Sequence, residues 1–196
     1  LASDGSYLYV GDIGNNNNRR KDLCVYKIKI SDIVQLDEVR AEEIEFNYKE
    51  QTAYPPTNDQ RFYDAEALVC YKGELWVFTK TNADPWTGKS LVYSVPTTSG
   101  KYVLSMKHEV YIGDAGWWAD AVTGADVIEN DFYLLTYNRI SVLRFAENSF
   151  ELINTLPFEN MTQKESIVIK DENTIFVADE KQPLLGGGNM YKITLK

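Results

Sequence analysis

The sequence is poor in the residues on which several common kinds of site depend. It contains one histidine, His108, which excludes zinc sites built from several histidines. It contains two cysteines, Cys24 and Cys70, each within a strand-like run, and we expect both to be buried thiols that act as small hydrophobic side chains. No apolar run approaches the roughly 20 residues that a membrane-spanning helix needs, so membrane insertion is not expected.

Basic residues are also scarce. The chain has 20 Lys and Arg against 29 Asp and Glu, a formal net charge of −9 at pH 7. A field of that sign repels phosphate backbones and anionic lipid, so we expect no nucleic acid among the partners. The 196 residues suit a single domain, and the 4 Trp, 13 Tyr and 8 Phe are typical of packed β-structure.

A pattern of short strands recurs four times along the chain. Its most apolar member, the second strand, is found at 7–10, 75–78, 132–135 and 175–178, each time after a turn sequence. A first strand precedes it at 65–70, 124–128 and 166–169, and a third follows at 25–28, 92–95, 142–145 and 190–193. Outer strands are predicted at 43–46, 108–111 and 150–153. Repeats of several short strands are typical of propeller blades.

We therefore predict an all-β propeller, one domain over 1–196, with blade units at about 1–48, 62–111, 120–155 and 163–196. The second strands are apolar without alternation, which predicts burial on both faces. The first unit retains only Leu1 and Ala2 as an inner strand, and the last ends at its third strand. The interpretation we favour is a five- or six-bladed ring that lacks its N-terminal portion, and the alternative is a complete four-bladed ring.

The candidate site follows from the fold. In propellers, the loops that enter the inner strands and those that join strands two and three open on one face around the central channel, where ligands commonly bind. The candidate rim residues are Asp12, Asn15, Asp64, Glu66, Lys80, Trp86, Trp117, Asp126, Arg139, Glu165 and Asp179.

Three of these carboxylates, Glu66, Asp126 and Glu165, occupy similar positions in successive units, so we expect them to converge near the channel mouth. Converging carboxylates raise one another's pKa or recruit a cation, and oxygen-only ligands favour calcium over zinc. The structural alternative is that each accepts hydrogen bonds from backbone amides of the neighbouring blade. The sequence contains no cofactor motif, so calcium is the one cofactor that we consider.

The segment 11–22 is rich in Gly and Asn, which tolerate positive φ. We expect either an ordered connecting loop held by side-chain turns, or a contact surface for a polar ligand or ion. Trp86, Trp117 and Trp118 are placed in loops, where they either fill gaps between blades or present aromatic faces to sugars or proteins. His108 is placed on the surface of an outer strand, away from the rim, which disfavours serine- or cysteine-type catalysis.

Residues 11–16 (Gly-Asp-Ile-Gly-Asn-Asn), Arg19 or Arg20, and 22–28 (Asp-Leu-Cys-Val-Tyr-Lys-Ile) resemble a motif of a family of exported bacterial propellers, often from Bacteroidetes. Residues 63–68 and 123–126 resemble the later units of that family. The resemblance implies an extracellular or periplasmic location, and the family has no settled activity to transfer. The chain is more distantly similar to phytase-like and gluconolactonase-type propellers, whose metal ligands do not map onto it.

Two functions are compatible with these observations. The first is a binding or scaffold module whose channel rim engages a small polar ligand, a glycan or a partner protein. The second is a metal-dependent hydrolase of phosphoesters or lactones, with Glu66, Asp126 and Glu165 as ion ligands or general acid and base. An enzyme requires these carboxylates to converge on an open pocket, whereas a scaffold would hold them in hydrogen bonds and expose tryptophan instead.

Overall fold

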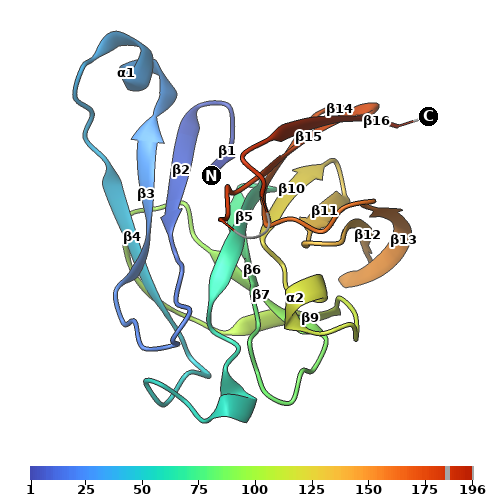
Figure 1. The fold of residues 1–196 in the computed structure, drawn as a ribbon. Helices are drawn as coiled ribbons and strands as arrows, with labels where there is room; N and C mark the ends of the chain where they lie inside the picture. Colours follow the sequence, from blue (N-terminus) through green and yellow to red (C-terminus); the bar gives the residue numbers. More distant parts are fainter. Residues whose placement is uncertain (184–185, 196) are drawn as a thin grey trace.

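A computed structural model describes residues 1–183 and 186–195 and shows four β-sheets arranged as the blades of a propeller-like ring (Figure 1). The first blade contains β1 (Ala2–Ser3), β2 (Tyr7–Asp12), β3 (Leu23–Lys29) and β4 (Glu42–Tyr48). The second contains β5 (Ala65–Tyr71), β6 (Glu74–Thr79), β7 (Lys89–Val95) and β9 (Met106–Tyr111). The third contains β10 (Gly124–Ile128), β11 (Asp131–Leu135), β12 (Arg139–Ala146) and β13 (Ser149–Pro157), and the fourth β14 (Lys164–Asp171), β15 (Thr174–Asp179) and β16 (Met190–Thr194).

The all-β fold with four blade units is confirmed, and each strand predicted from the repeat lies within or overlaps an observed strand. Consecutive strands of each blade pair antiparallel, as tight turns between neighbouring strands require. The turns use the residues that the sequence suggested. Lys72 and Gly73, between β5 and β6, both have positive φ, as a two-residue hairpin turn needs.

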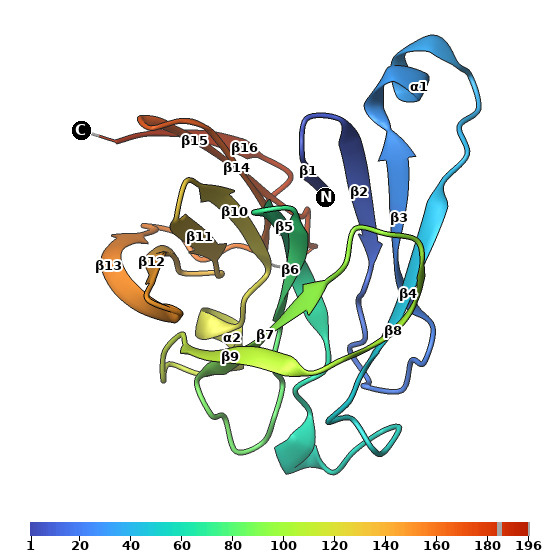
Figure 2. The same ribbon diagram turned by 180° about the vertical axis from the view of Figure 1, so that it is seen from behind.

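One strand was not predicted. β8 (Gly100–Leu104) leaves the second blade between β7 and β9 and pairs in parallel with β4, so that it forms the outermost strand of the first blade (Figure 2). Ile44 of β4 lies opposite Gly100 in this ladder, and Tyr48 opposite Leu104. This pairing of β8 with β4 joins the first two blades through backbone hydrogen bonds as well as through side-chain packing.

Three short helical segments were also missed: α1 (Ile30–Gln35), η1 (Asn58–Gln60) and α2 (Trp117–Asp120). Trp117 and Trp118 therefore lie on a helical turn that leads into the third blade, and not in an irregular loop. In residues 1–183 and 186–195, no helix is long and apolar enough to cross a membrane.

The core is divided into three layers, one between each pair of successive blades. Tyr9 and Val25 of the first blade meet Val77 of the second, and Val69 of the second meets Phe132 of the third. A third layer, which includes Leu135, Ile175 and Val177, joins the third and fourth blades. Blades thus adhere through apolar side chains that alternate along each strand.

Burial of the second strand on both faces is confirmed for β6 and β11, which lie between two blades. It is wrong for β2 and β15. Val10 of β2 and Phe176 of β15 point away from the neighbouring blade and are only half-buried, whereas Tyr9 and Val177 are buried. Successive residues of a strand face opposite sides, so packing against one blade buries only every second residue.

The placement of His108 requires a correction. It lies on the outer strand β9, as predicted, but it is half-buried, with its ring stacked 5.7 Å from that of Trp76. Burial lowers its pKa below the usual value, and the charge of Lys107 adds to the effect. Both cysteines are free thiols; the expected burial is confirmed for Cys24 and wrong for Cys70, which is only half-buried.

Candidate binding site at one end of the channel

The inner strands β5, β10 and β14 lie next to one another around the centre of the ring (Figure 1). At one end of this centre is a hollow of about 480 Å³, to which all four blades contribute. We call it the channel-end hollow. Its lining residues are Asn16, Glu66, Lys80, Trp117, Tyr137, Gln163, Glu165, Ser166, Ala178, Asp179 and Glu180.

The floor of the channel-end hollow is a chain of four polar side chains from three blades. Lys80 Nζ donates to Glu66 Oε2 at 2.8 Å and to the Tyr137 hydroxyl at 2.9 Å. The Tyr137 hydroxyl donates in turn to Glu165 Oε1 at 3.1 Å. Lys80 is only 4% exposed, and its ammonium lies 5.3 Å from the centre of the Trp117 ring. One cation therefore contacts Glu66 directly and Glu165 through the Tyr137 hydroxyl, next to the ring of Trp117.

The charges in this network perturb one another. Burial raises the pKa of Glu165 to about 7, the charge of Lys80 opposes that rise, and the nearby carboxylate of Glu66 adds to it. Burial by itself would lower the pKa of Lys80, but the charge and hydrogen bond of Glu66 outweigh it, so the pKa lies above its usual value. The site thus holds a fixed cation next to a carboxyl group that titrates near neutral pH.

Glu66 and Glu165 reach the hollow because each lies at an irregularity of its inner strand. The register of β5 against β6 shifts between Ala65 and Ala67, and that of β14 against β15 shifts between Lys164 and Ser166. At such a β-bulge, the extra residue leaves the regular alternation and its side chain takes a new direction. Two equivalent bulges thus turn two glutamates toward the same end of the channel.

Asp126 does not belong to this group. The strand β10 has an unbroken register, with Asp126 opposite Tyr133, and Gly124 lies nearer the strand end that corresponds to Glu66 and Glu165. Asp126 Oδ2 instead accepts a hydrogen bond of 2.7 Å from the backbone amide of Ile169 in the fourth blade. It therefore ties two blades together, and burial raises its pKa while this amide opposes the rise.

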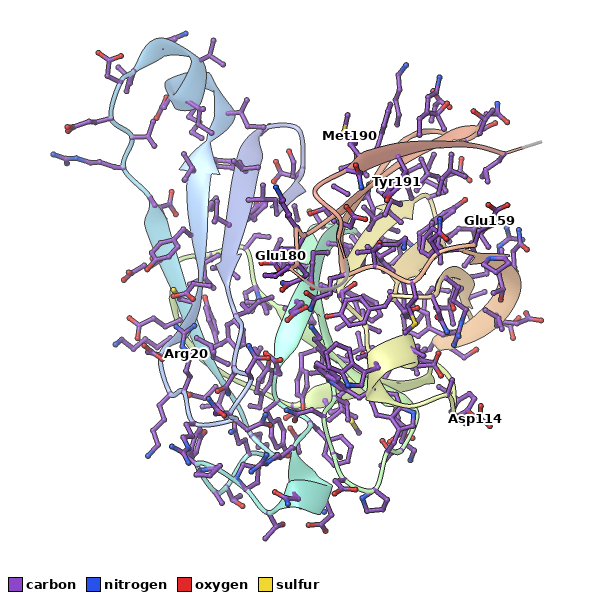
Figure 3. All side chains as sticks on the ribbon, viewed as in Figure 1. Arg20, Asp114, Glu159, Glu180, Met190 and Tyr191 are labelled. Atoms are coloured by element: carbon purple, nitrogen blue, oxygen red, sulfur yellow. The ribbon has the colours of Figure 1, made fainter. Side chains whose placement is uncertain are left out.

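Lys80 was predicted as a rim residue, whereas Tyr137 was not selected. Both follow the second strand of a blade. Glu180, which is labelled in Figure 3, follows the second strand of the fourth blade and also lines the hollow. The backbone amides of Lys80 and Glu180 donate to equivalent carbonyls, those of Asp64 and Gln163. The repeat was therefore sufficient to find Tyr137, because it occupies the position in the third unit that Lys80 occupies in the second.

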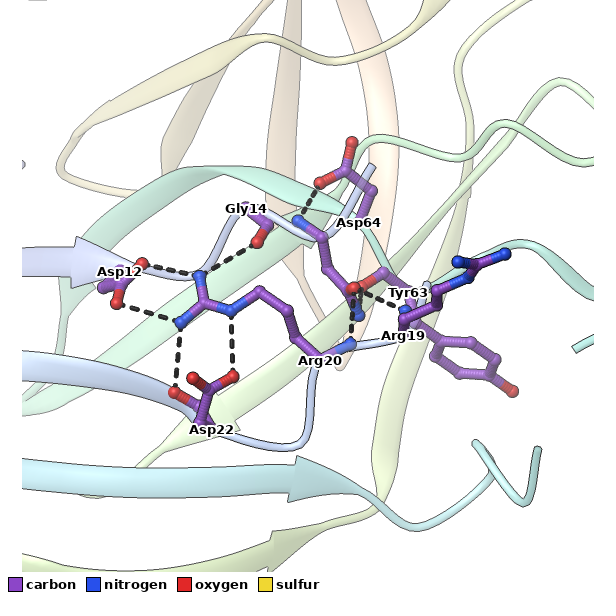
Figure 4. Close-up of polar contacts among 8 residues, drawn as sticks. Asp12, Gly14, Arg19, Arg20, Asp22, Tyr63 and Asp64 are labelled. Carbon is purple, nitrogen blue, oxygen red and sulfur yellow. Dashed lines mark hydrogen bonds and ion pairs between the residues drawn. The ribbon is translucent and has the colours of Figure 1, made fainter. Parts of the chain in front are cut away.

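The segment 11–22 is the ordered loop that one of the two interpretations described (Figure 4). Asn15 is 3% exposed, and its Oδ1 accepts from the backbone amides of Arg19 and Arg20 at 2.8 and 2.9 Å. Arg20 forms a two-point ion pair with Asp12 and a further bond to Asp22. Asp12 and Asn15 thus hold the loop in shape and lie outside the channel-end hollow.

The same loop is fastened to the second blade through Asp64. The Asp64 carboxylate, 1% exposed, accepts a hydrogen bond of 2.5 Å from the backbone amide of Asn15 (Figure 4). Burial raises the pKa of Asp64 to about 6, against the effect of this amide, and the charge of Glu66 contributes to the rise. Asp64 is one residue from the bulge, so this contact also supports the position of Glu66.

The remaining predicted rim residues divide between the hollow and its supports. Asp179 lines the hollow and accepts hydrogen bonds from Thr162 and Asn189. Arg139 pairs with buried Asp120 at 2.5 Å and holds the turn that carries Trp117. Trp86 donates to the Gly113 carbonyl at 2.9 Å and packs as a structural residue.

No protein-family model matches the chain, and no curated protein matches it. Among solved structures, Sqt1 of Saccharomyces cerevisiae aligns with 9% identity and a TM-score of 0.43 over 93% of this chain and 39% of that one. The β-propeller domain of Nup133 from Vanderwaltozyma polyspora aligns with 13% identity and a TM-score of 0.34 over 96% of this chain and 63% of that one. The chain thus spans less than two thirds of either structure.

Proposed function

We propose that the chain is an exported binding module whose channel-end hollow engages a small polar ligand, with a glycan as the leading class. The observation that carries the proposal is the convergence of Glu66, Lys80, Tyr137 and Glu165 on one hollow that also contains Trp117. The side chains come from three blades and are already held by hydrogen bonds to one another, so their positions are set before any ligand arrives.

The chemistry of the lining suits a ligand with several hydroxyl groups. Lys80 uses two of its three ammonium donors within the network and has one left for a ligand, while Glu66 and Glu165 offer carboxylate acceptors on either side of it. The half-buried ring of Trp117 supplies an apolar surface next to them. Most of the lining is polar, which suits a ligand with many hydroxyl groups better than an apolar one. The export part of the proposal is supported by the resemblance of residues 11–28 to an exported family.

The test is a screen of neutral mono- and oligosaccharides that follows intrinsic tryptophan fluorescence and confirms each hit by calorimetry. Trp117→Ala should abolish binding, because this ring lines the hollow. Tyr111→Ala is the control, because this aromatic side chain is 64% exposed and does not line the hollow. Sugar binding that survives Trp117→Ala would overturn this location, and binding of only a protein at this face would replace the glycan as ligand.

A hydrolase is the second candidate, and the different environments of two neighbouring carboxyl groups favour it. Glu66 is paired with Lys80, while Glu165 has its pKa raised to about 7. Unequal neighbouring carboxyl groups are the pattern of a general acid and base. Metal assistance would have to use Glu66 and Glu165 without Asp126, which is bound to the Ile169 amide.

The hydrolase candidate is tested with chromogenic phosphoesters and lactones, in the presence of calcium and in the presence of a chelator. Turnover that Glu165→Gln removes and Glu172→Gln preserves would support it. Glu172 is an exposed residue in the turn between β14 and β15, outside the channel-end hollow. Turnover that is equal in the two variants would assign the activity to a contaminant and contradict the candidate.

A further inference from the structure

A second hollow, of about 520 Å³, lies between the end of β13 and the strand β16. We call it the side hollow. It shares no lining residue with the channel-end hollow. Its lining includes Leu156, Phe158, Glu159, Lys164, Tyr191 and Ile193. Glu159 and Tyr191, both labelled in Figure 3, lie on the side of the molecule away from the first blade.

The buried charged group of the side hollow is the ammonium of Lys164, the first residue of β14. Its side chain is buried, with the residue only 3% exposed. Lys164 Nζ donates to the Asn160 carbonyl at 2.7 Å and to Thr162 Oγ1 at 2.9 Å. An ammonium group has three donors, and these two acceptors use two of them within the described part of the chain.

Lys164 lacks what buried ammonium groups ordinarily have, a carboxylate in contact. None of the ion pairs in residues 1–183 and 186–195 includes it. Asp179 is connected to it only through Thr162, whose hydroxyl donates to Asp179 Oδ2 at 2.6 Å. The other charges of the hollow are Glu159 and Lys192, which are both exposed.

The walls around this cation are largely apolar. The Phe158 ring centre is 4.5 Å from Lys164 Nζ and that of Tyr191 is 6.0 Å away, while Leu156 and Ile193 complete the apolar lining. A volume of about 520 Å³ falls within the range of small-molecule sites. An apolar pocket with a buried cation in its wall is complementary to a ligand with an apolar body and one negative charge.

We propose that the side hollow binds a small amphipathic monocarboxylate, with its carboxylate on Lys164 and its aromatic or aliphatic body against Phe158 and Tyr191. Such a ligand would supply the carboxylate that Lys164 lacks among residues 1–183 and 186–195, and would accept the third donor of the ammonium group. The titration of Lys164 agrees with this geometry. Burial lowers its pKa, the charge of Asp179 opposes the shift, and a bound carboxylate would oppose it further.

The test uses 3-phenylpropanoate and its neutral amide, 3-phenylpropanamide, as probes of equal size, each titrated into the whole chain by calorimetry or ligand-observed NMR. Because a charge-assisted hydrogen bond is stronger than a neutral one, the acid should bind at least about tenfold more tightly than the amide. Equal affinities for acid and amide, or no binding of the acid at millimolar concentration, would overturn the proposal. This comparison needs no variant.

Two lysine variants locate the site. Lys164→Met replaces the lysine by an unbranched apolar side chain of nearly the same length and removes the charge, so the preference for the acid should disappear. Lys170→Met makes the same change in net charge at an exposed position of the same strand, outside the hollow, and should keep the preference. A preference for the acid that persists in folded Lys164→Met would place the carboxylate elsewhere and refute the assignment.

Discussion

The ammonium of Lys80 lies 2.8 Å from the carboxylate of Glu66, although these residues are 14 positions apart. Glu66 lies in β5, and Lys80 directly follows β6 of the same blade. The pair has side-chain exposures of 5% for Lys80 and 22% for Glu66. An ion pair so removed from water is sensitive to the loss of one partner, because the remaining charge stays buried without compensation.

Replacing Lys80 by Met should therefore destabilise the protein strongly. Breaking one side of a buried pair costs about 3 kcal/mol or more, and here a second carboxyl group, Glu165, stands in the same network. Urea denaturation of the two proteins measures the difference in the free energy of unfolding.

The matched control is Lys101→Met, because Lys101 pairs with Glu45 at 2.7 Å but with side-chain exposures of 80% and 39%. An exposed pair contributes at most about 1 kcal/mol. Equal losses for the two variants would show that burial does not strengthen the dependence on Lys80 and would contradict the prediction.

Calcium is expected not to raise the melting temperature of the unmodified protein. The Lys80 ammonium already neutralises Glu66 and would repel a second cation beside Glu165. A specific ion at 100 times its dissociation constant would stabilise the fold by about 2.7 kcal/mol, which thermal melting detects. Calcium should stabilise Lys80→Met more than the unmodified chain, since neither Glu66 nor Glu165 then has a cationic side chain beside it. A clear rise in the melting temperature of the unmodified protein with calcium would contradict this expectation and support calcium binding at the rim.

The free energy of unfolding should fall as pH rises from about 4.5 to 7. The pKa of Glu165 is raised to about 7 from 4.5, so in this window the folded state holds a proton that the unfolded state has released. Ionisation of Glu165 in the folded state therefore costs stability. Glu165→Gln should reduce the slope of stability against pH in urea titrations at several pH values.

Glu172→Gln, at an exposed turn, should leave that slope unchanged. A residual slope is expected in every variant, because Asp64, with its pKa raised to about 6, acts in the same direction. A slope that is identical in Glu165→Gln and in the unmodified protein would mean that Glu165 titrates normally.

Asn15 and Asn17 should respond very differently to replacement by Ala. Asn15 makes three side-chain hydrogen bonds, to Arg19, Arg20 and Tyr63, and is buried, so its loss should cost about 2–3 kcal/mol. Asn17 is exposed and should stay within about 0.5 kcal/mol of the unmodified protein. Thermal or urea melting of both variants provides the measurement, and equal effects would argue against an anchored loop.

The four blade units were predictable because each strand carries its own signal, a short apolar run next to a turn sequence. Glu66 and Glu165 were predictable because they occupy similar positions in successive units. The prediction that Asp126 joins Glu66 and Glu165 was wrong because it assumed the same strand register in every repeat. The strand β10 has no bulge, and Asp126 lies further along it, opposite Tyr133. The bulges next to Glu66 and Glu165 insert one residue, and no residue type in the sequence marks that insertion.

Other features depend on contacts between distant segments. β8 pairs with a strand more than 50 residues earlier, and its sequence, Gly-Lys-Tyr-Val-Leu, has no turn that would direct it there. The network around Lys80 likewise arises from three blades, so that no local pattern joins Lys80 to Tyr137. Local propensity predicts elements, and the tertiary arrangement decides which of them meet.

The passage of β8 from the second blade to the edge of the first also orders events during synthesis. The outer edge of β4 obtains its partner only when residues up to Leu104 have left the ribosome, so the first blade is unfinished while most of the second is being made. A nascent chain arrested before β8 would expose the unpaired edge of β4 to other chains. The edge of the first blade is therefore completed only together with the second blade.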